Sequence, residues 1–418
     1  MKIIIIYIIV NFSLLYSQSS SLSMYGNGEF MNNYDAASVA SGESKYFAEN
    51  SNGYSLSSLT NHWKSKNTFI LMSLKFSENN IADIGELVKN NFSAFVVTFP
   101  FNDTKAFSFG MNPLFRSDIK IEEDGYEYIP ASILPIPEGS DSPNPLAFNS
   151  SYSFSGGISE AFITYSLRVN DNLSLGLRWS KIFGTTKYEY VLDIYNVLYN
   201  NSGMLLTDYS TDNFIYKKHQ YSSSRYLVEM KILEDNFEFA FSYGKSKPLK
   251  IKQTEYFHVL GIPYEQLFKD QGQLYQSGLG LKYNVNENLN LIAESHYNGT
   301  FKSYEFLNIF SYENPNVNSV NLGVNYKYKN PKINSRWNHL NFRMGFLNKK
   351  YIYNSFTVLD RGFTMGFGVE YLENRNVVDF AIKFGNRTSE YLDYNEERYF
   401  NFYFTFLTGE KWFSNERK

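Results

Sequence analysis

The chain of 418 residues contains no cysteine. This absence excludes a disulfide scaffold, a zinc site built on thiolates, a thiol nucleophile and a cysteine-linked lipid anchor. An excess of charge of one sign is also missing, because 39 basic residues face 42 acidic ones and the formal net charge is −3. The sequence therefore gives no electrostatic case for binding nucleic acid.

Long hydrophobic runs are scarce as well. The only run that approaches a membrane span follows Lys2, which excludes a bundle of membrane helices. A basic start, an apolar stretch of about ten residues and the small residues after it are typical of a secretory signal peptide. We therefore predict a signal peptide at residues 1–19; the alternative, a membrane anchor, is disfavoured because the stretch is short.

Aromatic residues are abundant. They make up 18% of the chain, with 37 Phe and 35 Tyr, although mean hydropathy is only −0.36. So many aromatic side chains can bury a large surface, which excludes a disordered chain. A polar average combined with this aromatic content calls for an arrangement that separates the two kinds of side chain.

The separation has a period of two residues, as in β-strands. In residues 172–180, Leu173, Leu175, Leu177 and Trp179 share one face, and the other face carries Asn, Ser, Gly and Arg. Stretches with the same alternation are 236–243, 319–327, 339–346, 362–371 and 398–406. A soluble sandwich and a transmembrane barrel both alternate in this way. Small residues on the polar face and tyrosines near strand ends favour the barrel.

Short and long connections also alternate along the chain. Six short ones lie near 100–104, 169–172, 233–236, 284–288, 328–338 and 372–376. Seven long polar stretches, expected to be irregular, are 77–90, 113–152, 193–213, 247–273, 300–316, 350–360 and 387–396. They define fourteen strands with both ends on the short-turn side, which is the periplasmic side of an outer-membrane barrel.

We therefore predict an all-β fold, an antiparallel transmembrane β-barrel of about fourteen strands over residues 67–407, in the outer membrane of a Gram-negative bacterium. A basic periplasmic tail follows at 408–418. Residues 20–66 are rich in Ser, Asn and Gly and break the pattern. They form either a disordered leader or a hatch that plugs the lumen, and the width of such a barrel favours the hatch.

Several motifs resemble the FadL-type outer-membrane transporters of long-chain fatty acids and hydrocarbons. The stretch 34–42 (YDAASVASG) is similar to the family's opening hatch motif, with Ser41 in place of the first glycine of a pair. Residues 55–59 (SLSSL) stand where the family has Asn-Pro-Ala. Residues 154–161 (FSGGISEA), with NLSLGLRW after them, look like its fourth and fifth strands. The resemblance implies passive uptake of a hydrophobic molecule past a movable hatch.

Asn112 and Pro113 interrupt the third strand after residues 106–111. Proline removes a ladder hydrogen bond, and a closed barrel has no free edge to accommodate it. The resemblance implies that Asn112 and Pro113 border a lateral exit from the lumen into the lipid. The alternative is that Pro113 begins the second long loop.

The polar face carries charges of both signs, which does not fit a simple anion or cation pore. Lumen-facing candidates are Arg178, Arg225, Glu229, Glu294, Arg343 and Glu370. These charges can pair with one another and with the hatch. A fatty-acid carboxylate would need one spare cation, which Arg178 or Arg343 could supply through bidentate hydrogen bonds.

The third and fourth long loops carry apolar side chains in polar surroundings, which usually marks a binding site. The candidate ligand-binding residues are Tyr190, Leu192, Tyr195 and Leu198 in the third loop, and Tyr256, Phe257, Leu260 and Phe268 in the fourth. Residues 264–276 are compatible with a short amphipathic helix. In FadL-type proteins these loops form the first capture groove; alternatively they pack together as a cap.

The sequence does not suggest an enzyme. None of the five histidines has a metal-binding partner at i+4 or a G-x-S-x-G neighbour, and we expect neither a catalytic site nor a metal or cofactor.

Our interpretation is a barrel for uptake of a hydrophobic small molecule, with outer-membrane lipid and the barrel assembly machinery as partners. A PorV-like partner in protein secretion, working with secretion-system subunits, and a surface adhesin are the rivals. A continuous apolar tunnel would favour transport, and a filled lumen would favour the rivals.

Overall fold

A computed structural model describes residues 20–24, 28–31, 35–49, 54–81, 85–127, 146–200, 203–208, 213–257, 264–268, 272–299, 304–306, 310–312, 314–329, 337–371, 376–389 and 396–410. The predicted signal peptide and most of the predicted tail lie outside these residues. No helix in the described part is long and apolar enough to cross a membrane.

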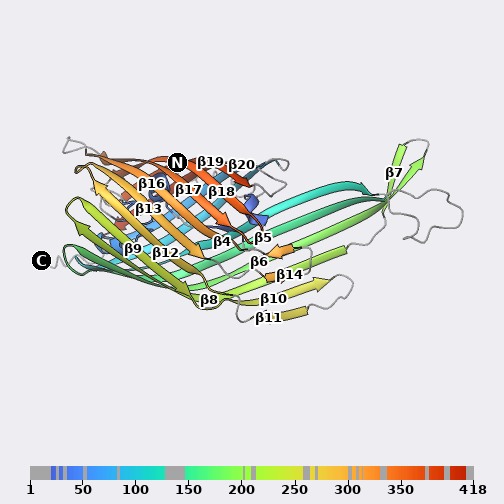
Figure 1. The fold of residues 1–418 in the computed structure, drawn as a ribbon, viewed down its shortest axis with the longest axis horizontal. Coiled ribbons are helices and arrows are strands. Elements are labelled where there is room, and N and C mark those ends of the chain that lie inside the picture. Colours follow the sequence, from blue (N-terminus) through green and yellow to red (C-terminus); the bar gives the residue numbers. More distant parts are fainter. Residues whose placement is uncertain are drawn as a thin grey trace.

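Fourteen antiparallel strands form a closed barrel (Figure 1). Their bounds are β2 (Thr68–Ile81), β3 (Gly85–Asn102), β4 (Lys105–Glu127), β5 (Leu146–Arg168), β6 (Leu173–Asn200), β8 (Asn213–Glu234), β9 (Phe237–Ser246), β12 (Tyr275–Asn284), β13 (Leu289–Gly299), β16 (Asn316–Lys329), β17 (Trp337–Ile352), β18 (Thr357–Tyr371), β19 (Asn376–Ser389) and β20 (Glu396–Glu410). The barrel closes where β20 pairs with β2 from Thr68↔Glu410 to Ile81↔Glu397. The predicted fold class and strand number are confirmed.

The two faces of the wall differ as the period of two predicts. On β9, Phe237, Phe239 and Phe241 are 42%, 46% and 43% exposed, whereas Glu238 and Ser242 are buried. Apolar side chains therefore face outward, toward lipid, and polar ones face the lumen. A polar average and a high aromatic content coexist because each strand contributes to both environments.

Several strands continue far beyond the barrel. β5, β6 and β8 extend to the right in Figure 1, and β7 (Gly203–Asp208) pairs with the end of β6. β10 (Lys250–Phe257) and β11 (Tyr264–Phe268) widen this extension, and β14 (Tyr304–Phe306) pairs with β15 (Phe310–Tyr312). Both termini of the barrel wall lie at its opposite, short-turn end.

This extension corrects the prediction of long irregular loops. Most of 193–213 and 247–273 is strand where the structure describes it, and Tyr264–Phe268 is a strand rather than part of a helix. Tyr, Val, Leu and Ile in these stretches favour paired strands, and β11 pairs with Ile251–Glu255 of β10. Residues 113–127, expected as loop, likewise continue β4.

The N-terminal segment lies inside the barrel. It comprises the 3₁₀ helix η1 (Ser21–Met24), β1 (Glu29–Phe30), helix α2 (Ala36–Ala40) and the 3₁₀ helix η2 (Leu59–Lys64). Asp35 caps α2 by accepting a hydrogen bond from the Ser38 amide at 2.6 Å. All five residues of α2 are buried, in contact with β17, β18, β19 and β20.

Candidate functional site

The wall under α2 is built to the shape of the N-terminal segment. Gly42 follows the helix with φ +74°, a conformation that other residues rarely adopt. A Cβ added to Gly345 of β17 would lie 2.1 Å from the Gly42 nitrogen, so only glycine permits this approach. Thr364 of β18 accepts a hydrogen bond from the Gly42 amide at 3.0 Å and donates one to the Ala40 carbonyl at 3.1 Å. The glycines of the polar face thus form a seat for the segment.

Two wall carboxylates bind backbone amides of the segment. Glu229 of β8 accepts hydrogen bonds from the Leu59 and Thr60 amides, both at 3.2 Å, and from the Ser58 and Thr60 hydroxyls at 2.6 and 2.7 Å. Glu294 of β13 accepts from the Lys45 and Tyr46 amides at 2.7 and 3.1 Å. Such charge-assisted bonds are about twice as strong as neutral ones. They attach the segment to two separate parts of the wall.

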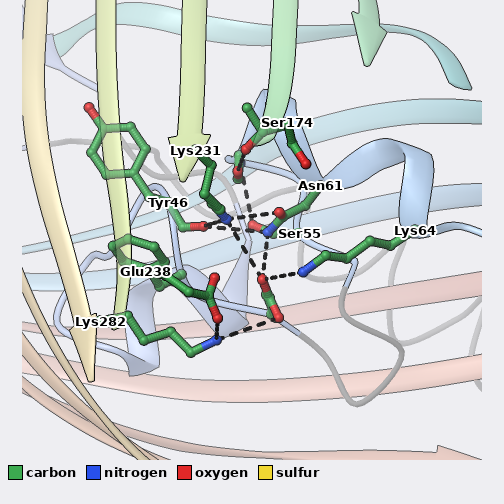
Figure 2. A network of polar contacts seen from close by, with 12 residues as sticks. Tyr46, Ser55, Asn61, Lys64, Ser174, Lys231, Glu238 and Lys282 are labelled. Carbon is green, nitrogen blue, oxygen red and sulfur yellow. Dashed lines mark hydrogen bonds and ion pairs between the residues drawn. The ribbon is translucent and has the colours of Figure 1, made fainter. Parts of the chain in front are cut away.

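A cluster of charges that includes Lys64, Lys231 and Lys282 ties the segment to the wall (Figure 2), and Glu49 is the residue they share. Its carboxylate lies 2.9 Å from Lys64 of the segment, 3.7 Å from Lys231 of β8 and 3.9 Å from Lys282 of β12. Lys282 is shared with Glu238 of β9 at 2.6 Å. Burial alone would raise the pKa of Glu49, but these ammonium groups hold it well below its usual range.

A second cluster lies around Glu43 and Glu29. Glu43 pairs with Lys349 of β17 and, at 2.8 Å, with Lys383 of β19. Burial opposes ionisation of Glu43, yet the two lysines hold its pKa well below the ordinary value. Arg387 of β19 lies 2.7 Å from Glu29, whose pKa falls to about 2 because Lys75 and Arg387 outweigh the effect of burial.

The remaining predicted lumen residues are buried and engaged. Arg178 lies over the Phe162 ring at 3.9 Å and donates to Thr164 at 2.9 Å. Arg343 pairs with Asp379 at 2.6 Å, and Glu370 of β18 is fully buried. Asp379 therefore already occupies the Arg343 guanidinium, and a role of Arg178 or Arg343 in binding a carboxylate ligand stays a prediction.

Inward-facing side chains around the described wall are buried. Ser73 of β2, Thr164 of β5, Glu229 of β8 and Arg343 of β17 each keep 2% of their surface or less. A side chain that bordered a water-wide tunnel would retain more exposed surface. Among the residues that the structure describes, the N-terminal segment and the wall charges fill the barrel.

At the seam between β3 and β4 the ladder ends near Asn112 and Pro113, although Lys89 of β3 still pairs with Asp118 of β4 at 2.9 Å. The two strands pair from Asn102↔Lys105 only as far as Phe95↔Met111. Among the described residues, no ladder joins 85–94 of β3 to 112–127 of β4. Pro113 lies within β4 at a bulge, so it does not begin a loop.

The N-terminal segment covers this seam from inside. β1 pairs with β4 at Glu29↔Arg116 and Phe30↔Phe115, and the two Phe rings lie 5.0 Å apart. Asn112 is buried and donates to Glu160 of β5 at 3.2 Å; Glu160 pairs with Arg225 at 3.4 Å. Asn112, Glu160 and Arg225 thus form one polar network beside Pro113.

The predicted ligand-binding residues lie on the extension. Tyr190, Leu192, Tyr195 and Leu198 belong to β6, Tyr256 and Phe257 to β10, and Phe268 to β11, while Leu260 lies outside the described residues. Tyr190 and Phe257 both pair with Ile215 of β8, which places the two groups two strands apart. The two groups therefore lie in one sheet, and their role in binding a ligand stays a prediction.

Sequence reasoning missed the acceptors Glu43 and Glu49. Two features of the sequence could have indicated them. Both are acidic residues in a segment that is otherwise mostly Ser, Asn and Gly, and the alternation of the wall strands places several lysines on the lumen face. The histidines carry polar contacts: His62 lies 2.7 Å from Ser108, and His296 lies 2.9 Å from Glu294. In the described part of the chain, no three His, Asp or Glu residues are grouped as a metal site.

Comparison with known proteins gives both a family and a fold. The BamG family model matches residues 1–418. No curated protein matches the sequence. The structure resembles the Pseudomonas putida toluene transporter TodX, with 11% identity, a TM-score of 0.50 and coverage of 92% of this chain and 99% of that one. It also resembles a Pseudomonas aeruginosa FadL homologue, with 12% identity, a TM-score of 0.52 and coverage of 90% and 98%.

A third similar structure is the monoaromatic hydrocarbon channel CymD, with 11% identity, a TM-score of 0.51 and coverage of 91% and 98%. At such low identity these likenesses establish the fold. They confirm the predicted FadL-type architecture and, together with the family match, the outer-membrane location.

Proposed function

The chain belongs to the BamG family, and we propose that it serves as a closed outer-membrane barrel that accompanies the machinery for barrel assembly, rather than as an open pore. The family name points to that machinery. One observation carries the proposal: the lumen is filled by the N-terminal segment, which is held by buried charges. The hydrocarbon channels that share the fold serve here as a guide to architecture alone.

The strength of the seal supports this reading. To clear the lumen, the segment must release Glu49 from Lys231 and Lys282, and Glu43 from Lys349 and Lys383. Removing one partner of an ion pair while the other charge stays buried typically costs about 3–5 kcal/mol. A barrel that works while closed needs no mechanism for meeting this cost, whereas a pore does.

The extension supplies a surface for a partner outside the membrane. β11 lies at the edge of the sheet, pairs only with β10 among the described strands, and is exposed along almost its whole length. An exposed edge offers backbone hydrogen bonds to another chain. We propose that this edge contacts either a machinery subunit or a client protein.

The test is isolation of the native complex. The tagged chain is purified from outer membranes in mild detergent, beside an equally abundant tagged barrel of another family. We expect subunits of the barrel assembly machinery in the first sample only, and slower appearance of other barrels in the outer membrane when the chain is depleted. A solitary chain whose depletion leaves barrel assembly unchanged would refute the proposal.

A second candidate function is uptake of a hydrophobic small molecule through the β3–β4 seam. The end of the β3–β4 ladder at Phe95↔Met111 favours it, because among the described residues a side opening there breaks only the short β1–β4 pairing. β1 would act as the gate, and Asn112 and Pro113 would border the exit. The ligand would enter lipid once β1 leaves β4.

Uptake is tested with a radiolabelled hydrocarbon in cells that carry the parent chain or Asn112→Leu. Loss of the Asn112–Glu160 hydrogen bond loosens the inner border of the seam, so uptake is expected to rise. Cells that lack the chain and take up the label at the parent rate would exclude this function. A fall in barrel assembly without any change in uptake would favour the first proposal instead.

A further inference from the structure

One row of outward-facing residues crosses the wall from β9 to β18. The row is fixed by strand pairing: Phe241↔Leu279, Leu279↔Ser295, Ser295↔Val320, Val320↔Asn348 and Asn348↔Arg361. Its chemistry changes along the way, from large apolar residues to a small serine and then to an amide and a guanidinium. Because barrel strands are tilted, the row also climbs, from a few residues above the short-turn end on β9 to the extracellular end on β17 and β18.

The wall is hollowed along this row. Two adjoining clefts of about 480 Å³ each share Phe241, Leu279, Ser295 and Val320. The depression arises because Ala293 and Ser295 of β13 stand between larger neighbours on both sides. Phe241, Leu279 and Val320 are 43%, 63% and 51% exposed, so the trough is open to the surrounding lipid.

The two ends of the trough differ in polarity. Toward the short-turn end it is lined by Met230, Ile232, Phe239 and Leu281. Toward the extracellular end its lining includes Asn318, Asn348 and Lys350. The trough is therefore amphiphilic along its length, with its polar end close to the turn that joins β17 to β18.

Two cations meet at the polar end. Lys350 pairs in register with Leu359, and Arg361 lies two residues beyond Leu359 on the same face of β18. Diagonal neighbours of this kind have Cα atoms about 7–8 Å apart, within reach of one phosphate group. Among the residues that the structure describes, neither Lys350 nor Arg361 has a carboxylate partner, whereas the neighbouring Arg398 pairs with Glu396 at 2.9 Å.

We propose that this trough binds one lipopolysaccharide molecule of the outer leaflet, with a phosphate on Lys350 and Arg361 and an acyl chain along Phe241, Leu279 and Val320. Charge complementarity selects this occupant, because free cations at the extracellular boundary of a lipid-facing groove match a phosphorylated head joined to apolar chains. Arginine and lysine both bind phosphate, the first through a planar pair of donors. The proposal is independent of whether the lumen transports anything.

The test uses the folded full-length protein and purified lipopolysaccharide, with binding followed by native mass spectrometry. Phosphatase-treated lipopolysaccharide is the comparison. We expect the parent to bind the phosphorylated form at least about tenfold more tightly, since each basic residue near a lipid surface adds roughly a factor of five. The double variant K350A/R361A is expected to lose this preference.

Matched variants separate the site from general effects. K181A/K187A removes two exposed lysines of β6 that do not line the trough, and it is expected to behave as the parent. A293W fills the trough and is expected to weaken binding of both lipid forms, whereas I163W adds the same ring to an exposed position of β5 that does not line the trough and is expected to have no effect.

Three results would overturn the proposal: equal binding of the two lipid forms, parent-like binding by K350A/R361A, or equal losses in A293W and I163W. The trough would instead be a protein interface if A293W abolished cross-linking of a protein subunit to the barrel and left lipopolysaccharide binding unchanged. Heat-dependent gel migration confirms that each variant is a folded barrel.

Discussion

Replacing Glu49 by glutamine is predicted to loosen the N-terminal segment inside the barrel. The substitution keeps the shape of the side chain and an acceptor for Asn61, but it removes the charge that Lys64, Lys231 and Lys282 share. Lys231 and Lys282 remain in the wall with side chains only 6% and 7% exposed. Because these two lysines lose the Glu49 carboxylate, binding of the segment inside the barrel becomes less favourable.

The expected size follows from this geometry. Breaking a buried ion pair costs about 3–5 kcal/mol. The contacts to Lys231 and Lys282 are long, at 3.7 and 3.9 Å, and Lys282 keeps Glu238, so the lower limit applies. A cost of about 3 kcal/mol corresponds to a population of the displaced segment that is on the order of 100-fold larger.

Single-cysteine labelling measures this population directly, because the chain has no native cysteine. Ser55 of the segment is only 2% exposed, so a thiol at S55C reacts with a maleimide only when the segment moves. We expect S55C/E49Q to react on the order of 100-fold faster than S55C. E238Q, which removes a wall carboxylate from Lys282 but no tether to the segment, is the matched control. An unchanged rate in E49Q, or an equal rise in E238Q, would refute the reasoning.

Three further outcomes are expected. Gly345→Ala places a Cβ against Gly42 and should expose the segment to protease, whereas Gly244→Ala, whose new Cβ meets the movable end of Leu227, should not. Glu229→Gln weakens four hydrogen bonds to residues 58–60 and should lower the unfolding temperature, as followed by heat-dependent gel migration; an unchanged temperature contradicts the proposed tether. Burial raises the pKa of Asp35 to about 6 against the hydrogen bonds from Ser38, so its carboxyl keeps its proton in the folded state while the unfolded chain ionises, and stability is lost as pH rises from 3.8 to about 6. The stability of Asp35→Asn relative to the parent should therefore increase with pH across that range. If thermal unfolding shows the same difference between the two proteins at every pH, the raised pKa of Asp35 is not the cause.

The sequence predicted the barrel wall because each wall strand repeats one simple physical rule. Alternation such as Leu173, Leu175, Leu177 and Trp179 is required wherever lipid covers one face of a strand. The pattern can therefore be recognised within each strand, without knowing which distant residues pair with it. The short turns were found for the same reason, since Asn and Asp mark them locally.

The loops were misjudged because strand length beyond the membrane depends on pairing between distant segments. Residues such as Tyr190 and Phe257 lie in polar stretches, and they are strand because both pair with Ile215 of β8 and Tyr190 also pairs with Tyr152 of β5. Pro113 illustrates the same limit. The proline predicted a break, but its place at a bulge beside β1 depends on contacts with the N-terminal segment.

The polar site was predictable in kind but not in pairing. Inward charges of both signs were visible in the alternation, and Glu229, Glu294 and Arg343 were among them. Several of their partners lie far away in the sequence, as with Arg343 and Asp379, 36 residues apart, or Glu294 and Ser44, 250 residues apart, and no local pattern specifies such pairs. For this reason the sequence could not exclude a spare cation.

Locking the N-terminal segment tests the central claim most directly. F30C/F115C joins the paired positions Phe30 and Phe115 of β1 and β4 by the only disulfide in the chain, and paired Cα atoms in an antiparallel ladder lie within disulfide range. If the barrel works while closed, cells that carry only the oxidised lock will assemble other barrels at the parent rate, with or without reductant. Loss of that activity in the oxidised form, restored by reductant, would contradict the account and require a segment that opens.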